Sequence, residues 1–194
     1  MLGRRKKEEV QPGDASGAAN FEDLEIDPET RLMGPVRFEE CVQKEIARGL
    51  RYGSRSALAL FEVGVAERPL SGPLPSPAKF VAQVLRKAAR KSDIVARVSP
   101  TLFAVLLVEA EAEGARQFTE RVRTAIGSHP YARRADGSGL FARAWAGVAP
   151  WEPSFDSVGA YAGAAERSLA STYRGYEAAQ AWFRGEGINK PFIA

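Results

Sequence analysis

The sequence predicts an α+β fold, an α/β sandwich in which a mixed central β-sheet is flanked by helices. Three observations predict it. Segments whose apolar residues recur three and four apart, which is typical of helices with one buried face, alternate with short apolar runs typical of strands. Two of these runs are close enough for a β-hairpin, whereas the others are separated by helices that can form crossovers. The 194 residues, 45% of them hydrophobic, are enough for one domain with a full core.

The first half of the chain predicts a helix, a strand and a second helix. A helix is expected over residues 35–52, because its apolar residues fall on one face and Pro35 suits a first helical turn. Residues 56–65 are short, apolar and bounded by turn residues, which predicts a strand. A Pro-rich loop follows at residues 67–77, and helical spacing returns over residues 80–89.

The second half predicts a hairpin, a helix, a strand and a final helix. The hairpin is expected around Ser99 and Pro100, where two apolar segments flank a short turn. The expected segments in chain order are 94–98 and 102–108 for the hairpin, 115–126 for a helix, 129–139 for a polar loop, 141–150 for a strand and 158–169 for a helix. No internal repeat is present in the sequence.

The composition along the chain predicts three parts. Residues 1–26 are short of large apolar side chains, so they are expected to form a flexible tail that cannot offset the entropy of ordering. One domain is expected over residues 27–184, and residues 185–194 form a C-terminal extension. The basic residues at positions 4–7 suit a contact with acidic lipid or a partner, although a solvated tail is the simpler interpretation.

Composition also excludes several classes of function. No run approaches the ~18 consecutive apolar residues that a membrane span needs, and no signal peptide is recognised, so a cytoplasmic protein is expected. A single cysteine, Cys41, and a single histidine, His129, exclude an internal disulfide and a Cys/His zinc site, and they offer no convincing Ser-His-Asp triad. The net charge of +3 favours a small anion over a nucleic acid polymer, because no dense basic stripe with interleaved aromatic residues is present.

Several motifs together resemble one family. Residues 27–32, DPETRL, are similar to the motif D-x-L-T-G-L, and residues 90–107 follow the register R-x-S-D-x-V-A-R-x-(GGDEF)-A-V-L-L without a gap. Residues 120–123, ERVR, and 145–150, WAGVAP, fall where the family has its third helix and its S-I-G-V-A strand. On these motifs, residues 27–183 resemble a GGDEF domain, the fold of diguanylate cyclases.

The departures from the family concern its catalytic residues. The GGDEF pentapeptide is replaced by Ser99, Pro100, Thr101, Leu102 and Phe103. In the family, the two glycines let the backbone approach the nucleotide and the acidic pair holds a divalent cation. Glu62 stands where the first strand usually provides a metal-binding Asp, and Gly64 replaces a second acidic position. The nucleotide-recognising segment has become residues 67–79, and Tyr173 replaces a phosphate-binding Lys. We therefore expect no cyclase activity, no catalytic residues, no metal and no cofactor.

One binding motif of the family is retained. Arg90 and Asp93 form the R-x-x-D motif of the family's inhibitory, product-binding site, and Arg121 falls where the family supplies a second arginine. A guanidinium can hydrogen-bond or stack on guanine or pair with phosphate, and a carboxylate accepts from guanine N1–H and N2–H. The resemblance therefore implies a receptor for the dianion cyclic di-GMP, with Arg90, Asp93 and Arg121 as ligand-binding residues. Arg86 and Glu120 are expected to contribute less.

The resemblance also implies partners and leaves alternatives. Cyclic di-GMP is expected to bind as an intercalated dimer in bacterial second-messenger signalling, with a protein partner or a second copy of the chain joining through the ligand. A first alternative is a ligand-independent interaction scaffold, because R-x-x-D is common and can be a surface ion pair worth under ~1 kcal/mol. A second alternative is a residual enzyme that uses GTP through Glu62.

Overall fold

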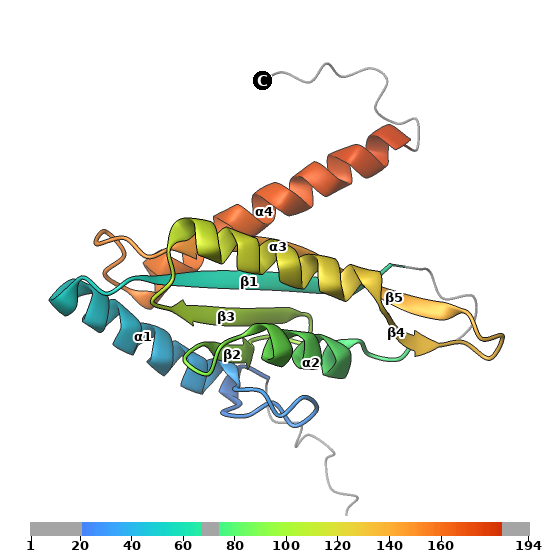
Figure 1. Cartoon of the computed structure of the whole chain (residues 1–194), viewed down its shortest axis with the longest axis horizontal. Coiled ribbons are helices and arrows are strands. Elements are labelled where there is room, and N and C mark those ends of the chain that lie inside the picture. The colour runs from blue at the N-terminus through green and yellow to red at the C-terminus, as the bar shows by residue number, and fades with distance from the viewer. Residues whose placement is uncertain (1–20, 67–73, 184–194) are drawn as a thin grey trace, which may run out of the picture.

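The computed structural model describes residues 21–66 and 74–183, and it contains four α-helices and five strands within them (Figure 1). In chain order the elements are η1 (Phe21–Asp23), α1 (Pro35–Tyr52), β1 (Ser56–Val65), α2 (Ala78–Ala88), β2 (Ile94–Arg97), β3 (Leu102–Val108), α3 (Ala112–Ser128), β4 (Pro130–Arg133), β5 (Gly139–Pro150) and α4 (Val158–Phe183). The predicted order of helices and strands is confirmed, with β4 as an addition. No helix in the described part of the chain is long and apolar enough to cross a membrane.

The sheet has the strand order β2-β3-β1-β5-β4, and every pair of neighbouring strands is antiparallel. The α+β class is therefore confirmed, but the expectation of a mixed sheet is wrong. The helical crossover from β1 through α2 does return a strand that runs in the direction of β1, namely β2, but β3 lies between them. Strands that run the same way are thus never neighbours, and the parallel bridge in the described residues, Met33 to Ala96, is isolated.

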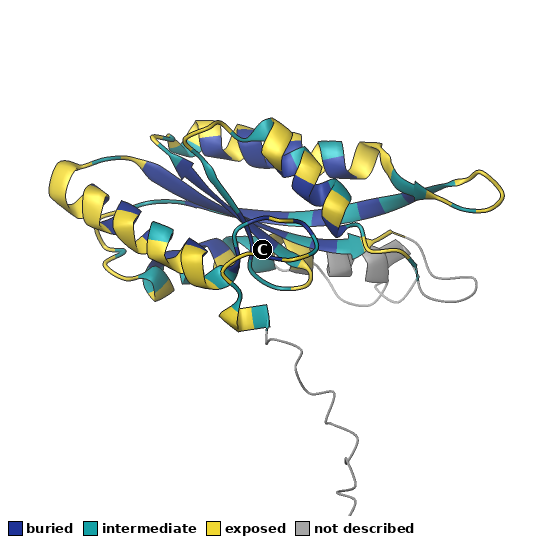
Figure 2. Ribbon diagram, turned by 90° about the horizontal axis from the view of Figure 1, so that it is seen from below, coloured by how far each residue is buried: buried dark blue, intermediate teal, exposed yellow. Residues whose placement is uncertain are grey.

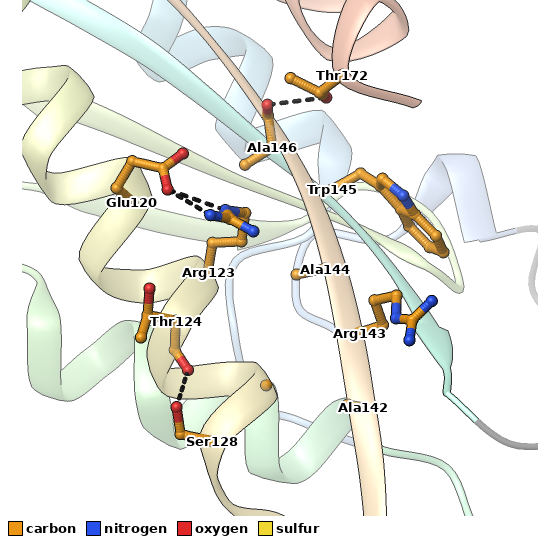
Figure 3. Close-up of a pocket in the computed structure, with 11 residues that line it drawn as sticks. Glu120, Arg123, Thr124, Ser128, Ala142, Arg143, Ala144, Trp145, Ala146 and Thr172 are labelled. Atoms are coloured by element: carbon orange, nitrogen blue, oxygen red, sulfur yellow. Dashed lines mark hydrogen bonds and ion pairs between the residues drawn. The ribbon is translucent and has the colours of Figure 1, made fainter. Parts of the chain in front are cut away.

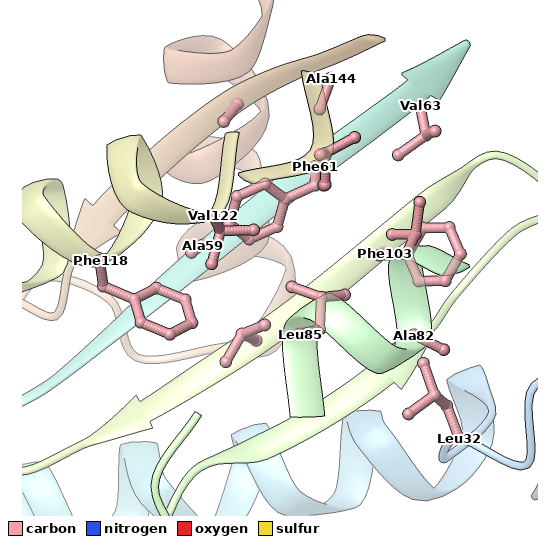
Figure 4. Packing of buried hydrophobic residues seen from close by; sticks show 14 of the residues in the cluster. Leu32, Ala59, Phe61, Val63, Ala82, Leu85, Phe103, Phe118, Val122 and Ala144 are labelled. Carbon is pink, nitrogen blue, oxygen red and sulfur yellow. The ribbon is translucent and has the colours of Figure 1, made fainter. Parts of the chain in front are cut away.

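The sheet separates two apolar layers. Alternate residues of β1 point to opposite faces, so Phe61 joins the layer under α2 and α3, whereas Leu60 joins the layer under α1 and α4. Phe103 is 1% exposed in the first layer (Figure 4), and Tyr161 is fully buried in the second. The sheet is dark blue throughout most of its length, and the exposed sides of the helices face outward (Figure 2). This two-layer packing fixes where the loops between elements lie.

Helix α1 matches its predicted bounds because both ends carry sequence signals. Pro35 occupies the first turn, where its missing N–H is not needed. Gly53 ends the helix in a left-handed conformation with φ 65°, and its N–H donates to the carbonyl of Gly49 at 2.8 Å.

Strand β4 lies within the region predicted to be a polar loop, residues 129–139. It pairs with the start of β5 through a hairpin whose turn contains Gly137 at φ 84°. Its residues are exposed or half-buried, so they show no alternation of apolar and polar residues. The prediction of a loop is therefore wrong for Pro130–Arg133.

Residues 21–26 have defined structure, although they precede the predicted start of the domain at Asp27. Phe21–Asp23 form a short 3-10 helix, the N–H of Gly34 donates to the carbonyl of Glu25 at 2.7 Å, and Ile26 bridges to Met33. Residues 21–26 thus belong to the fold rather than to the tail predicted for residues 1–26. Residues 1–20, the C-terminal extension 185–194 and most of the Pro-rich loop lie outside the described residues.

Gly147 is required where α4 crosses β5. A Cβ at this position would lie 2.1 Å from the backbone nitrogen of Leu169 and 2.5 Å from its Cα. We expect Gly147→Ala to lower the free energy of unfolding by about 1–3 kcal/mol or more, because only a movement of the whole helix relieves the clash. Denaturant unfolding measures this. The matched control is Gly127→Ala in α3, where a Cβ meets nothing within 4 Å. A Gly147→Ala protein as stable as the control would contradict the packing.

Candidate functional site

The turn between α2 and β2 is held by the carboxylate of Asp93. One carboxylate oxygen accepts the N–H of Arg90 at 2.7 Å, and the other accepts the N–H of Val108 at 3.3 Å. The N–H of Asp93 in turn donates to the carbonyl of Arg90 at 3.1 Å. Asp93 therefore ties the turn to the end of β3. Each carboxylate oxygen has a further lone pair with which it can accept a hydrogen bond from a ligand.

The three residues singled out by the sequence line one pocket. This pocket, of about 410 Å³, lies between the α2–β2 turn, the end of β3 and helix α3. Arg90 and Asp93 come from the turn, and Arg121 comes from α3. Its other lining residues are Arg55, Ala88, Leu107, Val108, Glu109, Ala110, Glu111, Gly114, Gln117 and Phe118. The volume falls within the range of about 300–1,000 Å³ that is usual for small-molecule sites.

Arg90 and Arg121 present exposed guanidinium groups in this pocket. Neither Arg90 nor Arg121 forms an ion pair within residues 21–66 and 74–183. The guanidinium of Arg121 lies over the ring of Phe118, with 5.6 Å between its central carbon and the ring centroid. The stacking orients Arg121 without neutralising it, so two positive charges remain available to an anion.

Acidic residues at the rim of the same pocket are partly neutralised. Glu111 forms an ion pair with Arg55, and Glu109 lies 3.8 Å from a guanidinium nitrogen of Arg48. Sequence reasoning missed Arg55, Phe118 and Gln117. Gln117 could have been found, because it precedes Arg121 by four residues and so lies on the same face of α3.

The two lesser candidates do not line this pocket. The guanidinium of Arg86 donates to the carbonyl of Thr30 at 2.9 Å, on the other side of the turn. Glu120 pairs with Arg123 at 2.6 Å and lines a different pocket, of about 770 Å³, between α3, β5 and α4 (Figure 3). In that pocket the hydroxyl of Thr172 on α4 donates to the carbonyl of Ala146 at 3.1 Å.

The β2–β3 turn carries the residues that stand in place of the GGDEF pentapeptide. The hydroxyl oxygen of Ser99 accepts the N–H of Thr101 at 3.4 Å and the N–H of Leu102 at 3.0 Å. The carbonyl of Pro100 accepts a guanidinium N–H of Arg97 at 2.7 Å. The Ser99 hydroxyl, the Pro100 carbonyl and the N–H groups of Thr101 and Leu102 are thus engaged within the protein.

Aromatic and apolar side chains surround Glu62 near this turn. In the sheet, Glu62 is directly opposite Leu102 on one side and Trp145 on the other. A Cβ added at Gly64 would lie 3.3 Å from the Trp145 ring, and Tyr173 of α4 packs edge-on against that ring with centroids 5.1 Å apart. Glu62, Gly64 and Tyr173, which stand where the family has acidic residues and a lysine, therefore gather around Trp145.

A comparison of the sequence with models of protein families identifies the domain that carries the candidate pocket. The sequence profile described as "Diguanylate cyclase, GGDEF domain" matches residues 79–174, which include the α2–β2 turn, the hairpin and α3. The chain contains a GGDEF domain. The resemblance found from the motifs is thereby confirmed at the level of the domain.

Relatives of the GGDEF domain include an enzyme much longer than this chain. Diguanylate cyclase DgcP from Pseudomonas aeruginosa is 33% identical over 111 residues, which cover 54% of this chain and 16% of that protein. The match thus spans only about one sixth of the relative's length.

Solved structures share the GGDEF fold. The GGDEF domain of FimX from Pseudomonas aeruginosa has a TM-score of 0.68 at 20% identity, covering 78% of this chain and 95% of that one. The GGDEF domain of DgcB from Caulobacter crescentus, in complex with c-di-GMP, has a TM-score of 0.65 at 18% identity, covering 79% and 92%. At these identities the likeness concerns the fold. It confirms the predicted GGDEF, palm-like architecture.

Proposed function

We propose that this GGDEF domain is a catalytically inactive receptor for cyclic di-GMP, which binds in the pocket formed by Arg90, Asp93 and Arg121. The observation that carries the proposal is the meeting of these three residues, from two separate elements, in one pocket of about 410 Å³. Two unpaired guanidinium groups and one carboxylate with free lone pairs complement a dianion that carries two guanine bases.

Each side chain has a distinct role in this proposal. Arg90 is exposed and able to reach guanine O6 and N7 or a phosphate, and Arg121 presents a planar group that stacks on a base or pairs with phosphate. Asp93 accepts the N1–H and N2–H of a guanine while it holds the turn. Bound as an intercalated dimer, the ligand presents a second, similar face. That face is the proposed contact for a partner protein or a second copy of this chain.

The residues near the hairpin support the absence of cyclase activity. Mg²⁺ requires nearly octahedral coordination by oxygen and usually takes one or two carboxylates together with substrate phosphates. Positions 99–103 supply no carboxylate, and Glu62 stands between Leu102 and Trp145. No group of three or more His, Cys, Asp or Glu residues that could hold a metal ion was found in the described part of the chain. These residues do not fit the divalent cation of the family, and we assign them no catalytic step.

The proposal is tested by two measurements on the full chain. Filtration or dialysis with labelled cyclic di-GMP is expected to show saturable binding that unlabelled cyclic di-GMP displaces and GMP does not. Incubation with GTP and Mg²⁺ or Mn²⁺, followed by nucleotide chromatography, is expected to yield no cyclic product. Cyclic product above the level of a Glu62→Ala control would show a residual enzyme, and partner capture without any binding of the nucleotide would favour the scaffold.

A further inference from the structure

A second basic site lies on the α1 side of the Arg90–Asp93 turn. Here the N-terminal segment, the start of α1, the end of α2 and the turn itself surround a basin of about 430 Å³, in the region where the blue chain meets α2 and β2 in Figure 1. The cationic residues that line this basic basin are Arg31, Arg37, Arg86, Arg90 and Lys91. Except for Arg90, none of them lines the proposed pocket for cyclic di-GMP.

The charges of the basic basin are unbalanced. Its five cations are all exposed, and none of them takes part in an ion pair within the described residues. The single carboxylate in its lining is Asp93, which already accepts two backbone N–H groups. Like charges gathered in one shallow, open depression repel one another and raise the local concentration of anions. The basin is therefore suited to an anion that carries several negative charges.

Two of its arginines are held in place by the backbone. Arg86 is fixed by its hydrogen bond to the carbonyl of Thr30. Arg31 has φ 60°, a left-handed conformation that glycine adopts without strain and that is uncommon for a large side chain. Its N–H donates to the carbonyl of Asp27 at 2.8 Å, within a turn closed by the buried Asp27 carboxylate and Thr30. Strained residues of this kind cluster at binding sites, where the surrounding structure imposes them.

We propose that the basic basin is a second anion site, which binds the phosphate groups of a small, multiply charged phosphate compound. Because Arg90 lines both pockets, one guanidinium serves two ligands, and the two anions also repel each other. Occupancy of the basin is therefore expected to weaken the binding of cyclic di-GMP. By thermodynamic reciprocity, bound cyclic di-GMP lowers the affinity of the basin for its own ligand by the same factor. The site itself does not depend on the proposed receptor function, whereas the coupling does.

The test uses inorganic tripolyphosphate as the probe, titrated into the full chain by calorimetry. We expect saturable binding that Arg37→Gln and Arg31→Gly each weaken by about tenfold, through the loss of one charged contact. Arg31→Gly removes the cation and also relieves the strain of the left-handed backbone conformation, so the variant should stay folded. A loss of affinity in this variant is therefore not explained by unfolding. The matched control is Arg51→Gln, which removes a charge from the other end of α1, outside the basin, and is expected to leave the affinity unchanged.

The outcomes separate this inference from the proposed function. Arg121→Ala is expected to weaken the binding of cyclic di-GMP but not that of tripolyphosphate. Arg90→Ala is expected to weaken the binding of both. Binding of cyclic di-GMP without binding of tripolyphosphate would overturn the second site and leave the receptor intact. The reverse result would support the second site and overturn the receptor. Retention on vesicles with acidic phospholipid but no binding of free tripolyphosphate would identify a lipid-binding surface instead and contradict the proposal. An equal loss of affinity for tripolyphosphate in Arg37→Gln and Arg51→Gln would also contradict the proposal.

Discussion

Replacing Arg90 with alanine is expected to weaken the binding of cyclic di-GMP by about 10- to 100-fold, the loss usual for a charged hydrogen bond to a ligand. The side chain of Arg90 contributes an unpaired guanidinium to the pocket. Only its backbone takes part in the turn, since its N–H donates to the Asp93 carboxylate at 2.7 Å and its carbonyl accepts the N–H of Asp93 at 3.1 Å. Alanine retains both groups. The fold should therefore survive, and calorimetry on the folded variant measures the loss of the ligand contact alone.

The control for Arg90→Ala is Arg116→Ala. Arg116 lies on α3, as Arg121 does, and is exposed, but it pairs with Glu113 at 3.0 Å and lines neither basic site. Its replacement removes the same charge and should leave the affinity for cyclic di-GMP unchanged. An unaltered dissociation constant in Arg90→Ala, or an equal loss of affinity for cyclic di-GMP in both variants, would show that the R-x-x-D motif is not part of the binding site.

Replacing Arg97 with alanine is expected to lower the free energy of unfolding by about 3–5 kcal/mol, the usual result of removing one partner from a buried ion pair. Arg97 is 5% exposed and joins the N-terminal segment to the hairpin. Its guanidinium lies 3.2 Å from the buried carboxylate of Asp27 and 2.6 Å from the partly exposed carboxylate of Glu29. Its central carbon is 5.5 Å from the ring centroid of Phe21 and 5.7 Å from that of Phe103. The variant leaves Asp27 without its cation. Denaturant unfolding measures the effect.

The pH dependence of this loss provides a control. Burial alone would raise the pKa of Asp27, but hydrogen bonds from Thr30 and from Arg97, together with the charge of Arg97, outweigh it and hold the pKa below its ordinary value of 3.8. The ionised carboxylate therefore contributes stability above that value, and this contribution is lost as the pH falls through the lowered pKa. The difference in the free energy of unfolding between the wild-type protein and Arg97→Ala should therefore become smaller at acidic pH. A constant difference of under ~1 kcal/mol would contradict a structural role of the pair.

The sequence predicts those elements whose ends and faces carry local signals. Helix α1 is an example, because Pro35 and Gly53 mark its ends. Strand β4 is the opposite case, since half-exposed residues of a short edge strand show no alternation. The antiparallel sheet could not be derived either, because the insertion of β3 between β1 and β2 is set by packing rather than by any local pattern.

The candidate site divides in the same way. Arg90 and Asp93 are three residues apart in one turn, and the family register supplied Arg121, so their meeting in one pocket could be anticipated. The basic basin could not be anticipated, because Arg31 of the N-terminal segment, Arg37 of α1 and Arg86 of α2 come together only in the folded structure. The left-handed backbone of Arg31 is likewise visible only in three dimensions.

Titration of the unmodified full chain with cyclic di-GMP in a calorimeter tests the central claim most directly. The receptor proposal predicts a saturable heat with a dissociation constant in or below the range of about tens of micromolar. Stronger binding at low salt is also expected, because two guanidinium groups meet a dianion. The absence of any saturable heat at cyclic di-GMP concentrations on the order of tens of micromolar would contradict the proposal and leave the domain as a scaffold.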